Sequence, residues 1–113
     1  MSQITTHVLD TSKGLPAQGI QISLEGRNVE GNWTKLGNGT TDTDGRISNL
    51  LDTDTLLDPG TYRMVFQTGD YYKACGSYGF YPSVIIEFET TDSNHYHIPL
   101  LLNPFGYSTY RGS

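Results

Sequence analysis

The sequence YHIPLLLNPFGYSTYRGS, residues 96–113, decides much of the fold. Two strand-like runs, residues 94–102 and 106–111, flank a short Pro/Gly connection at residues 103–106. A connection this short predicts that the two strands are neighbours in a hairpin. In the first strand every second residue is apolar or aromatic and is expected to face the core: Tyr96, Ile98, Leu100 and Leu102.

The opposite face of this strand mixes polar and apolar side chains: His95, His97, Pro99 and Leu101. Near the other end of the chain, residues 4–10 (ITTHVLD) alternate in the same way, so His7 and Leu9 point away from Ile4 and Val8. One arrangement of these strands gathers four polar side chains on a common non-core face: His7, His97, Ser108 and Tyr110. Such a face is more typical of a pocket or an interface than of a solvated surface.

Short alternating segments recur along the rest of the chain, and we expect strands at residues 20–25, 32–36, 46–48, 61–67 and 84–89. Residues 11–19 and 37–45 read as loops, the second closed by an Asp-Gly turn. One short helix is predicted at residues 69–76, with Asp70 as its cap, Gly76 as its stop and Cys75 as a buried apolar residue. The pattern predicts an all-β fold, an antiparallel β-sandwich of about eight strands with one short helix.

Composition excludes several classes of protein. A chain of 113 residues predicts a single domain over residues 1–113. The net charge of −5 argues against nucleic acid and membrane surfaces as partners. Cys75 is the only cysteine, which excludes an internal disulfide and fits a reducing compartment. The N-terminal residues, MSQITTHVLD, show no secretory signal, so we expect a cytoplasmic protein.

The polar face suggests acid–base chemistry. An imidazole such as His7 or His97 is the natural general base near neutral pH. Arg46, just after the Asp-Gly turn, can supply a fixed cation for an anionic substrate or a developing oxyanion. Ser113 offers a hydroxyl group and a terminal carboxylate, but no Gly-x-Ser-x-Gly elbow supports a serine nucleophile. Each of these residues could instead be an ordinary surface residue.

A metal site is the alternative for the histidines. His95 and His97 lie two residues apart on one strand face, and His7 could complete a three-imidazole zinc site. The position of this third ligand is conjecture, so we expect no metal. The run Asp42-Thr43-Asp44-Gly45 resembles part of a calcium loop but lacks its first Asp and its closing Glu.

Several segments together carry a family resemblance: Thr6–Asp10, Gly14, Pro16-Ala17, Asp44-Gly45-Arg46, His97–Leu102 and Tyr107–Ser113. Over essentially the whole chain the sequence resembles the transthyretin-related family of 5-hydroxyisourate hydrolases. The terminal Tyr-Arg-Gly-Ser is a mark of the enzyme branch. The hormone carrier transthyretin is similar in fold, but it has Lys, Glu and Thr where this chain has His7, Arg46 and His97.

The resemblance implies a homotetramer, a dimer of dimers, whose active sites lie in a channel between the dimers. It implies hydrolytic ring opening of 5-hydroxyisourate, the product of urate oxidation, to 2-oxo-4-hydroxy-4-carboxy-5-ureidoimidazoline, without a cofactor. His7 and His97 would position and deprotonate water, Arg46 would hold the substrate, and Tyr110 and Ser113 would close the pocket. Ser108 is a further expected substrate contact. The alternatives are a non-catalytic small-ligand carrier and an adhesion module, although the latter normally has a secretion signal or disulfides.

Overall fold

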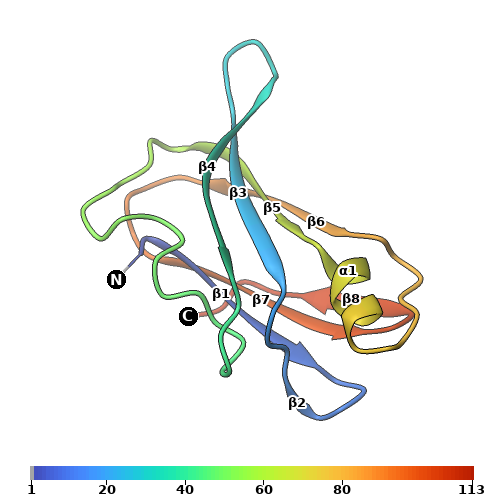
Figure 1. Cartoon of the computed structure of the whole chain (residues 1–113). Coiled ribbons are helices and arrows are strands. Elements are labelled where there is room, and N and C mark those ends of the chain that lie inside the picture. Colours follow the sequence, from blue (N-terminus) through green and yellow to red (C-terminus); the bar gives the residue numbers. More distant parts are fainter. Residues whose placement is uncertain (1) are drawn as a thin grey trace.

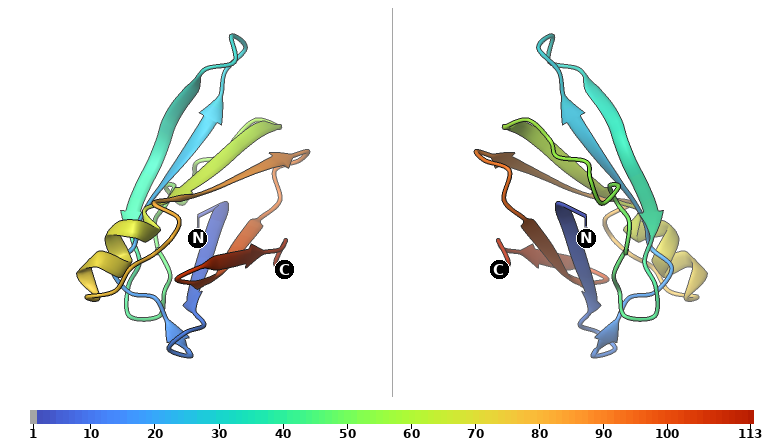
Figure 2. Two further views of the ribbon diagram at one scale, coloured as in Figure 1. Left: turned by 90° about the vertical axis from the view of Figure 1, so that its right-hand side faces the viewer. Right: turned by 90° about the vertical axis from the view of Figure 1, so that its left-hand side faces the viewer.

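The computed structural model describes residues 2–113 as two four-stranded sheets packed face to face (Figures 1 and 2). One sheet has the strand order β2-β1-β7-β8 and the other β4-β3-β5-β6. The elements are β1 (Ile4–Asp10), β2 (Leu15–Pro16), β3 (Gln21–Arg27), β4 (Trp33–Thr40), β5 (Gly60–Phe66), α1 (Thr68–Ala74), β6 (Val84–Thr90), β7 (Tyr96–Asn103) and β8 (Gly106–Thr109). The predicted β-sandwich of about eight strands with one short helix is confirmed.

The first sheet contains one pairing that differs from the antiparallel expectation. β1 and β7 run parallel, with Ile4 opposite Tyr96 and Asp10 opposite Leu102. The predicted hairpin is present, because β7 and β8 are antiparallel and Asn103 pairs with Gly106 across the turn. β8 ends at Thr109, two residues earlier than expected.

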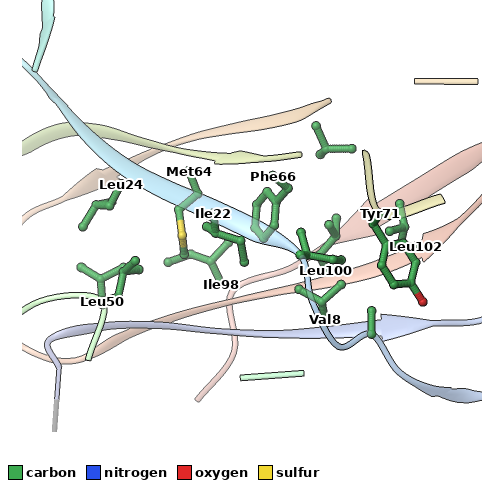
Figure 3. Packing of buried hydrophobic residues seen from close by; sticks show 14 of the residues in the cluster. Val8, Ile22, Leu24, Leu50, Met64, Phe66, Tyr71, Ile98, Leu100 and Leu102 are labelled. Atoms are coloured by element: carbon green, nitrogen blue, oxygen red, sulfur yellow. The ribbon is translucent and has the colours of Figure 1, made fainter. Parts of the chain in front are cut away.

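The core lies between the sheets and consists of the alternate apolar residues of each strand. Buried and partly exposed residues alternate along β1 and along β5 from Thr61 onward. The core residues labelled in Figure 3 include Ile22, Leu24, Met64 and Phe66 from one sheet and Val8, Ile98, Leu100 and Leu102 from the other. Each such side chain stabilises the fold by about 1.5–3 kcal/mol when it leaves water.

The prediction of a loop at residues 37–45 and a strand at residues 46–48 is partly wrong. β4 continues to Thr40, while residues 46–48 form turns with a single bridge from Arg46 to His7. The glycines at positions 37 and 39, which read as loop residues, are strand residues over which the following loop packs. A Cβ atom on Gly37 would lie 2.1 Å from the Leu50 carbonyl oxygen.

The ends of the helix follow the prediction only in part. Asp70 does not cap α1: the N-cap is Gln67, which makes no side-chain capping bond, and Asp70 lies inside the first turn. There a carboxylate still interacts favourably with the helix dipole. Gly76 follows the helix with φ +74°, a conformation that ends helices and favours glycine.

Two further expectations at this end of the molecule are wrong. Cys75 is exposed because α1 turns Tyr71 and Tyr72 toward the core and leaves the next turn in solvent. Its sulfur accepts a hydrogen bond from Lys13 Nζ at 3.3 Å. The expected loop at residues 11–19 contains the short strand β2, which pairs with the end of β1. Within residues 2–113, none of the helical segments has the length and apolar character needed to cross a membrane.

Candidate functional site

An open pocket of about 540 Å³ lies against the face of β1 and β7 that points away from the core. Its lining comes from β1, from the loop after β4, from the start of β7 and from the C-terminal tail. The lining residues are Thr5, Thr6, Asp42, Arg46, Ile47, Ser48, His95, His97, Tyr110, Gly112 and Ser113. The pocket therefore joins segments from both ends of the chain with one loop from its middle.

The parallel register of β1 and β7 puts the two predicted histidines on one face. Thr5 lies opposite His97 and His7 lies opposite Pro99, so His7 and His97 project from the same side of the sheet. Both histidines are partly exposed, whereas Thr6 between Thr5 and His7 is almost fully buried. His7 does not itself line the pocket in the single chain, but it borders the pocket through Arg46.

A tight loop fixes Arg46 beside His7. The Asp42 carboxylate accepts hydrogen bonds from the backbone N–H groups of Asp44 and Arg46, at 2.8 and 3.1 Å. Gly45, with φ +74°, brings its carbonyl within 2.9 Å of the Val8 nitrogen. A Cβ atom at position 45 would lie 2.4 Å from the Val8 oxygen, so this approach to β1 requires glycine.

The C-terminal tail folds back over His97. The Gly112 nitrogen donates to the His97 oxygen at 2.8 Å, and a Cβ atom on Gly112 would lie 2.5 Å from the imidazole. Tyr110 and Ser113 thereby reach the pocket lining. Ser108 is not brought into the pocket: it pairs with Leu101 in β8 and is exposed to solvent.

Two lining residues, Thr5 and His95, were not expected to belong to a catalytic site. The Thr5 hydroxyl lies 2.7 Å from His95 Nε2 and 2.8 Å from His97 Nδ1, which links the two imidazoles. The sequence carried a signal for Thr5, because it shares the strand face of His7. His95 figured only in the metal alternative. Within residues 2–113, no group of three or more His, Cys, Asp or Glu side chains is placed to hold a metal ion.

Burial and nearby positive charge hold the pKa of His7 and the pKa of His97 below the ordinary value. For His97, loss of hydration is the larger cause, and Arg46, His95 and His7 act in the same direction. The pKa of His7 is lowered by burial and then by Arg46, while a backbone hydrogen bond with Asp44 acts in the opposite direction. Both imidazoles are therefore neutral near pH 7 and able to accept a proton.

Comparison with known proteins gives one consistent family. The profile of the HIUase/Transthyretin family matches residues 4–112. The 5-hydroxyisourate hydrolase of mouse (Mus musculus) is 45% identical over 114 residues, which are 99% of this chain and 96% of the mouse protein. The uric acid degradation bifunctional protein TTL of Arabidopsis thaliana is 45% identical over 97% of this chain, and the chain spans only 37% of its length.

Solved structures with the same fold include a transthyretin in complex with thyroxine and a 5-hydroxyisourate hydrolase. Sea bream transthyretin in complex with thyroxine has a TM-score of 0.92 and 31% identity, over 98% of this chain and 95% of that one. Klebsiella pneumoniae 5-hydroxyisourate hydrolase has a TM-score of 0.84 and 34% identity, over 97% of this chain and 98% of that one. The fold alone therefore does not distinguish these two functions.

The charge of Arg46 is expected to control the titration of both histidines. Replacing Arg46 with Gln removes a cation next to His7 and His97, so the pKa of each imidazole should rise toward its ordinary value. In the wild type the pKa of each imidazole is lower in the folded protein than in the unfolded chain. The unfolded chain therefore binds protons first, so the stability of the fold should fall as the pH drops through about 6.5. NMR titration of the imidazole resonances measures both pKa values.

Arg27→Gln is the matched control, because Arg27 is an exposed arginine at the end of β3. It should leave both titrations unchanged. Equal titration curves for the wild type and Arg46→Gln would contradict the electrostatic account of the site.

Proposed function

The chain belongs to the HIUase/Transthyretin family, and from this we propose that it is a 5-hydroxyisourate hydrolase. It opens the ring of 5-hydroxyisourate to give 2-oxo-4-hydroxy-4-carboxy-5-ureidoimidazoline, as a step in urate degradation, and residues 1–113 act as a single hydrolase domain. The observation that carries this proposal is that His97 and Arg46 line one pocket, with His7 bridged to Arg46 at the border of that pocket. The pKa of both imidazoles is lowered there.

The mechanism assigned to these groups is base-assisted attack of water. His7 and His97 position a water molecule, and one of them removes its proton as the oxygen attacks the ring carbonyl. The Arg46 guanidinium binds the substrate and stabilises negative charge that develops on the carbonyl oxygen. Tyr110 and Ser113 contact the substrate and close the pocket. Ser108, which lies outside the pocket lining, is given no part in this mechanism.

Modest catalytic effects are sufficient for this chemistry. A positioned general base contributes about 10²–10⁴-fold to a rate, and a charge-stabilising donor about 10²–10³-fold. No step requires a cofactor or a metal ion, since water, a base and a cation complete the hydrolysis.

A non-catalytic carrier of a small ligand is the second candidate, and the structural similarity to sea bream transthyretin favours it. A carrier has no need for neutral imidazoles held next to a cation. The carrier sequence described above also differs from this chain at His7, Arg46 and His97. The hydrolase is therefore the better account of the pocket.

The assembly belongs to the proposal as well: a homotetramer built as a dimer of dimers. β6 and β8 each lie at the edge of their sheet, and such edges readily pair with another chain. Both strands carry exposed apolar or aromatic residues, Ile85 at 51% and Tyr107 at 44% exposure. Pairing the same edges of two copies would cover them symmetrically.

The cellular setting that we propose is the cytoplasm, with the substrate as the small-molecule partner and neither nucleic acid nor membrane as a further partner. The free, exposed Cys75 thiol fits a reducing compartment. The acidic net charge of −5 disfavours anionic partners. Cell fractionation checks the location directly.

Ring opening is tested by generating 5-hydroxyisourate from urate with urate oxidase and following its ultraviolet decay. The protein should accelerate the decay above the spontaneous rate. His7→Ala and His97→Ala should each lower kcat/KM by about 10²–10⁴-fold, and Arg46→Ala by about 10²–10³-fold. Arg27→Ala, the control at a remote arginine, should keep full activity.

Two results would count against different parts of the proposal. Decay at the spontaneous rate with the folded wild-type protein would sink the hydrolase and favour the carrier. Full activity of His97→Ala would leave hydrolysis intact but show that the two-histidine mechanism is wrong.

The tetramer is tested by light scattering coupled to size-exclusion chromatography. The wild type should have four times the 12.5 kDa mass of the chain. Ile85→Glu, which places a charge on the β6 edge, should lower this mass, whereas Val29→Glu on the exposed turn between β3 and β4 should not. A single-chain mass for the wild type would overturn the proposed assembly.

A further inference from the structure

The Thr5 side chain lines the pocket, and its hydroxyl lies between two imidazole rings. It lies 2.7 Å from His95 Nε2 and 2.8 Å from His97 Nδ1. The two imidazole rings are nearly parallel, with an interplanar angle of 26° and centroids 6.3 Å apart. This position follows from the sheet, because Thr5 is the residue opposite His97 in the parallel ladder.

A hydroxyl group that is hydrogen-bonded to two imidazole rings couples the tautomers of the two rings. The hydroxyl has one proton to donate and lone pairs that accept, and each neutral imidazole carries one N–H. If the hydroxyl donates to one ring, it must accept from the other. His97 can therefore hold its proton on Nδ1, donating to Thr5, when Thr5 donates to His95 Nε2.

The two ends of this hydrogen-bonded chain differ in their surroundings. His97 is half-buried, and the charges of Arg46, His95 and His7 disfavour a further positive charge on it. His95 is exposed at the pocket wall, where water can solvate an imidazolium. The hydrogen-bonded chain therefore runs from a half-buried ring to a ring in contact with solvent.

We propose that Thr5 is a positioning residue that holds His97 in the Nδ1–H tautomer and connects it to His95 as a proton relay. In this tautomer Nε2 is the unprotonated nitrogen of His97, and it acts as the general base toward water. The inference rests on the proposed hydrolysis and deepens it, because it selects the base and adds Thr5 and His95 to the machinery.

The relay balances without any other reactant. An O–H bond of the attacking water breaks and its proton binds His97 Nε2. The proton of His97 Nδ1 passes to Thr5 Oγ1, and the original Thr5 proton passes to His95 Nε2. One positive charge therefore moves to His95, and no electrons leave or enter the chain. The reverse sequence lets His97 Nε2 return a proton to the ring nitrogen released by the opened amide.

The test compares Thr5→Val, which keeps the shape but removes the hydroxyl, with Thr5→Ser, which keeps the hydroxyl. Thr5→Val should lower kcat by about tenfold or more, toward the range of a lost general base, and Thr5→Ser should restore most of the rate. Nitrogen-15 NMR of the imidazole should show Nδ1–H for His97 in the wild type and in Thr5→Ser. In Thr5→Val the spectrum should shift toward the Nε2–H form.

His95→Gln tests the far end of the relay. The glutamine amide can still accept a hydrogen bond from Thr5 but cannot take up a proton, so the His97 tautomer should persist while kcat falls. Full kcat in His95→Gln would overturn the relay.

The relay and the hydrolase fail in distinguishable ways. If the wild type hydrolyses 5-hydroxyisourate and Thr5→Val is equally fast, or Thr5→Ser is as slow as Thr5→Val, the relay is wrong and the hydrolase stands. An inactive wild type sinks the hydrolase and with it the relay. An Nε2–H tautomer of His97 in the wild-type spectrum overturns the assignment whatever the activity.

Discussion

The parallel pairing of β1 with β7 is the constraint on which the site depends. Its unbroken register joins residues 4–10 to residues 96–102, so the two ends of the chain are held as neighbouring strands. Because side chains alternate across a sheet, this register sends Val8 and Leu100 into the core and His7 and His97 to the opposite face. A slip of one residue would exchange the two sets, so burial of the core also fixes the histidines.

Close backbone approach completes the site from two further segments. Gly45 and Gly112 bring the loop after β4 and the C-terminal tail so near to β1 and β7 that neither position has room for a Cβ atom. Burial of the two imidazoles lowers their pKa values, and Arg46, which the same closeness places beside them, lowers the values further. The site therefore keeps neutral bases next to a cation, an arrangement that is unfavourable for the protonated imidazole and useful for proton removal.

Sequence patterns predicted the features that follow from alternation and turn chemistry. They indicated the sandwich, the terminal hairpin, the shared face of His7 and His97, and the arrival of Tyr110 near them. They did not predict that the glycines of β4 are strand residues. Gly37 is needed because the Leu50 carbonyl packs where a Cβ atom would lie, and a contact between residues so far apart in the sequence leaves no local pattern. For the same reason the link from Thr5 to His95 escaped prediction: it exists only once β1 and β7 pair. Ser108 was expected in the pocket because alternation gives the face of a strand but not where a pocket ends. Cys75 was expected to be buried because composition does not tell which side of a short helix is covered.

The central claim is that one pocket joins His7, His97 and Arg46 around the same substrate. A crystal structure of the protein with bound urate, the unreactive precursor of 5-hydroxyisourate, tests it most directly. The account predicts that the purine ring lies in the pocket, with its oxygens within hydrogen-bond distance of the Arg46 guanidinium and one edge facing both imidazoles. Urate bound at another surface, with these three side chains free of it, would contradict the account.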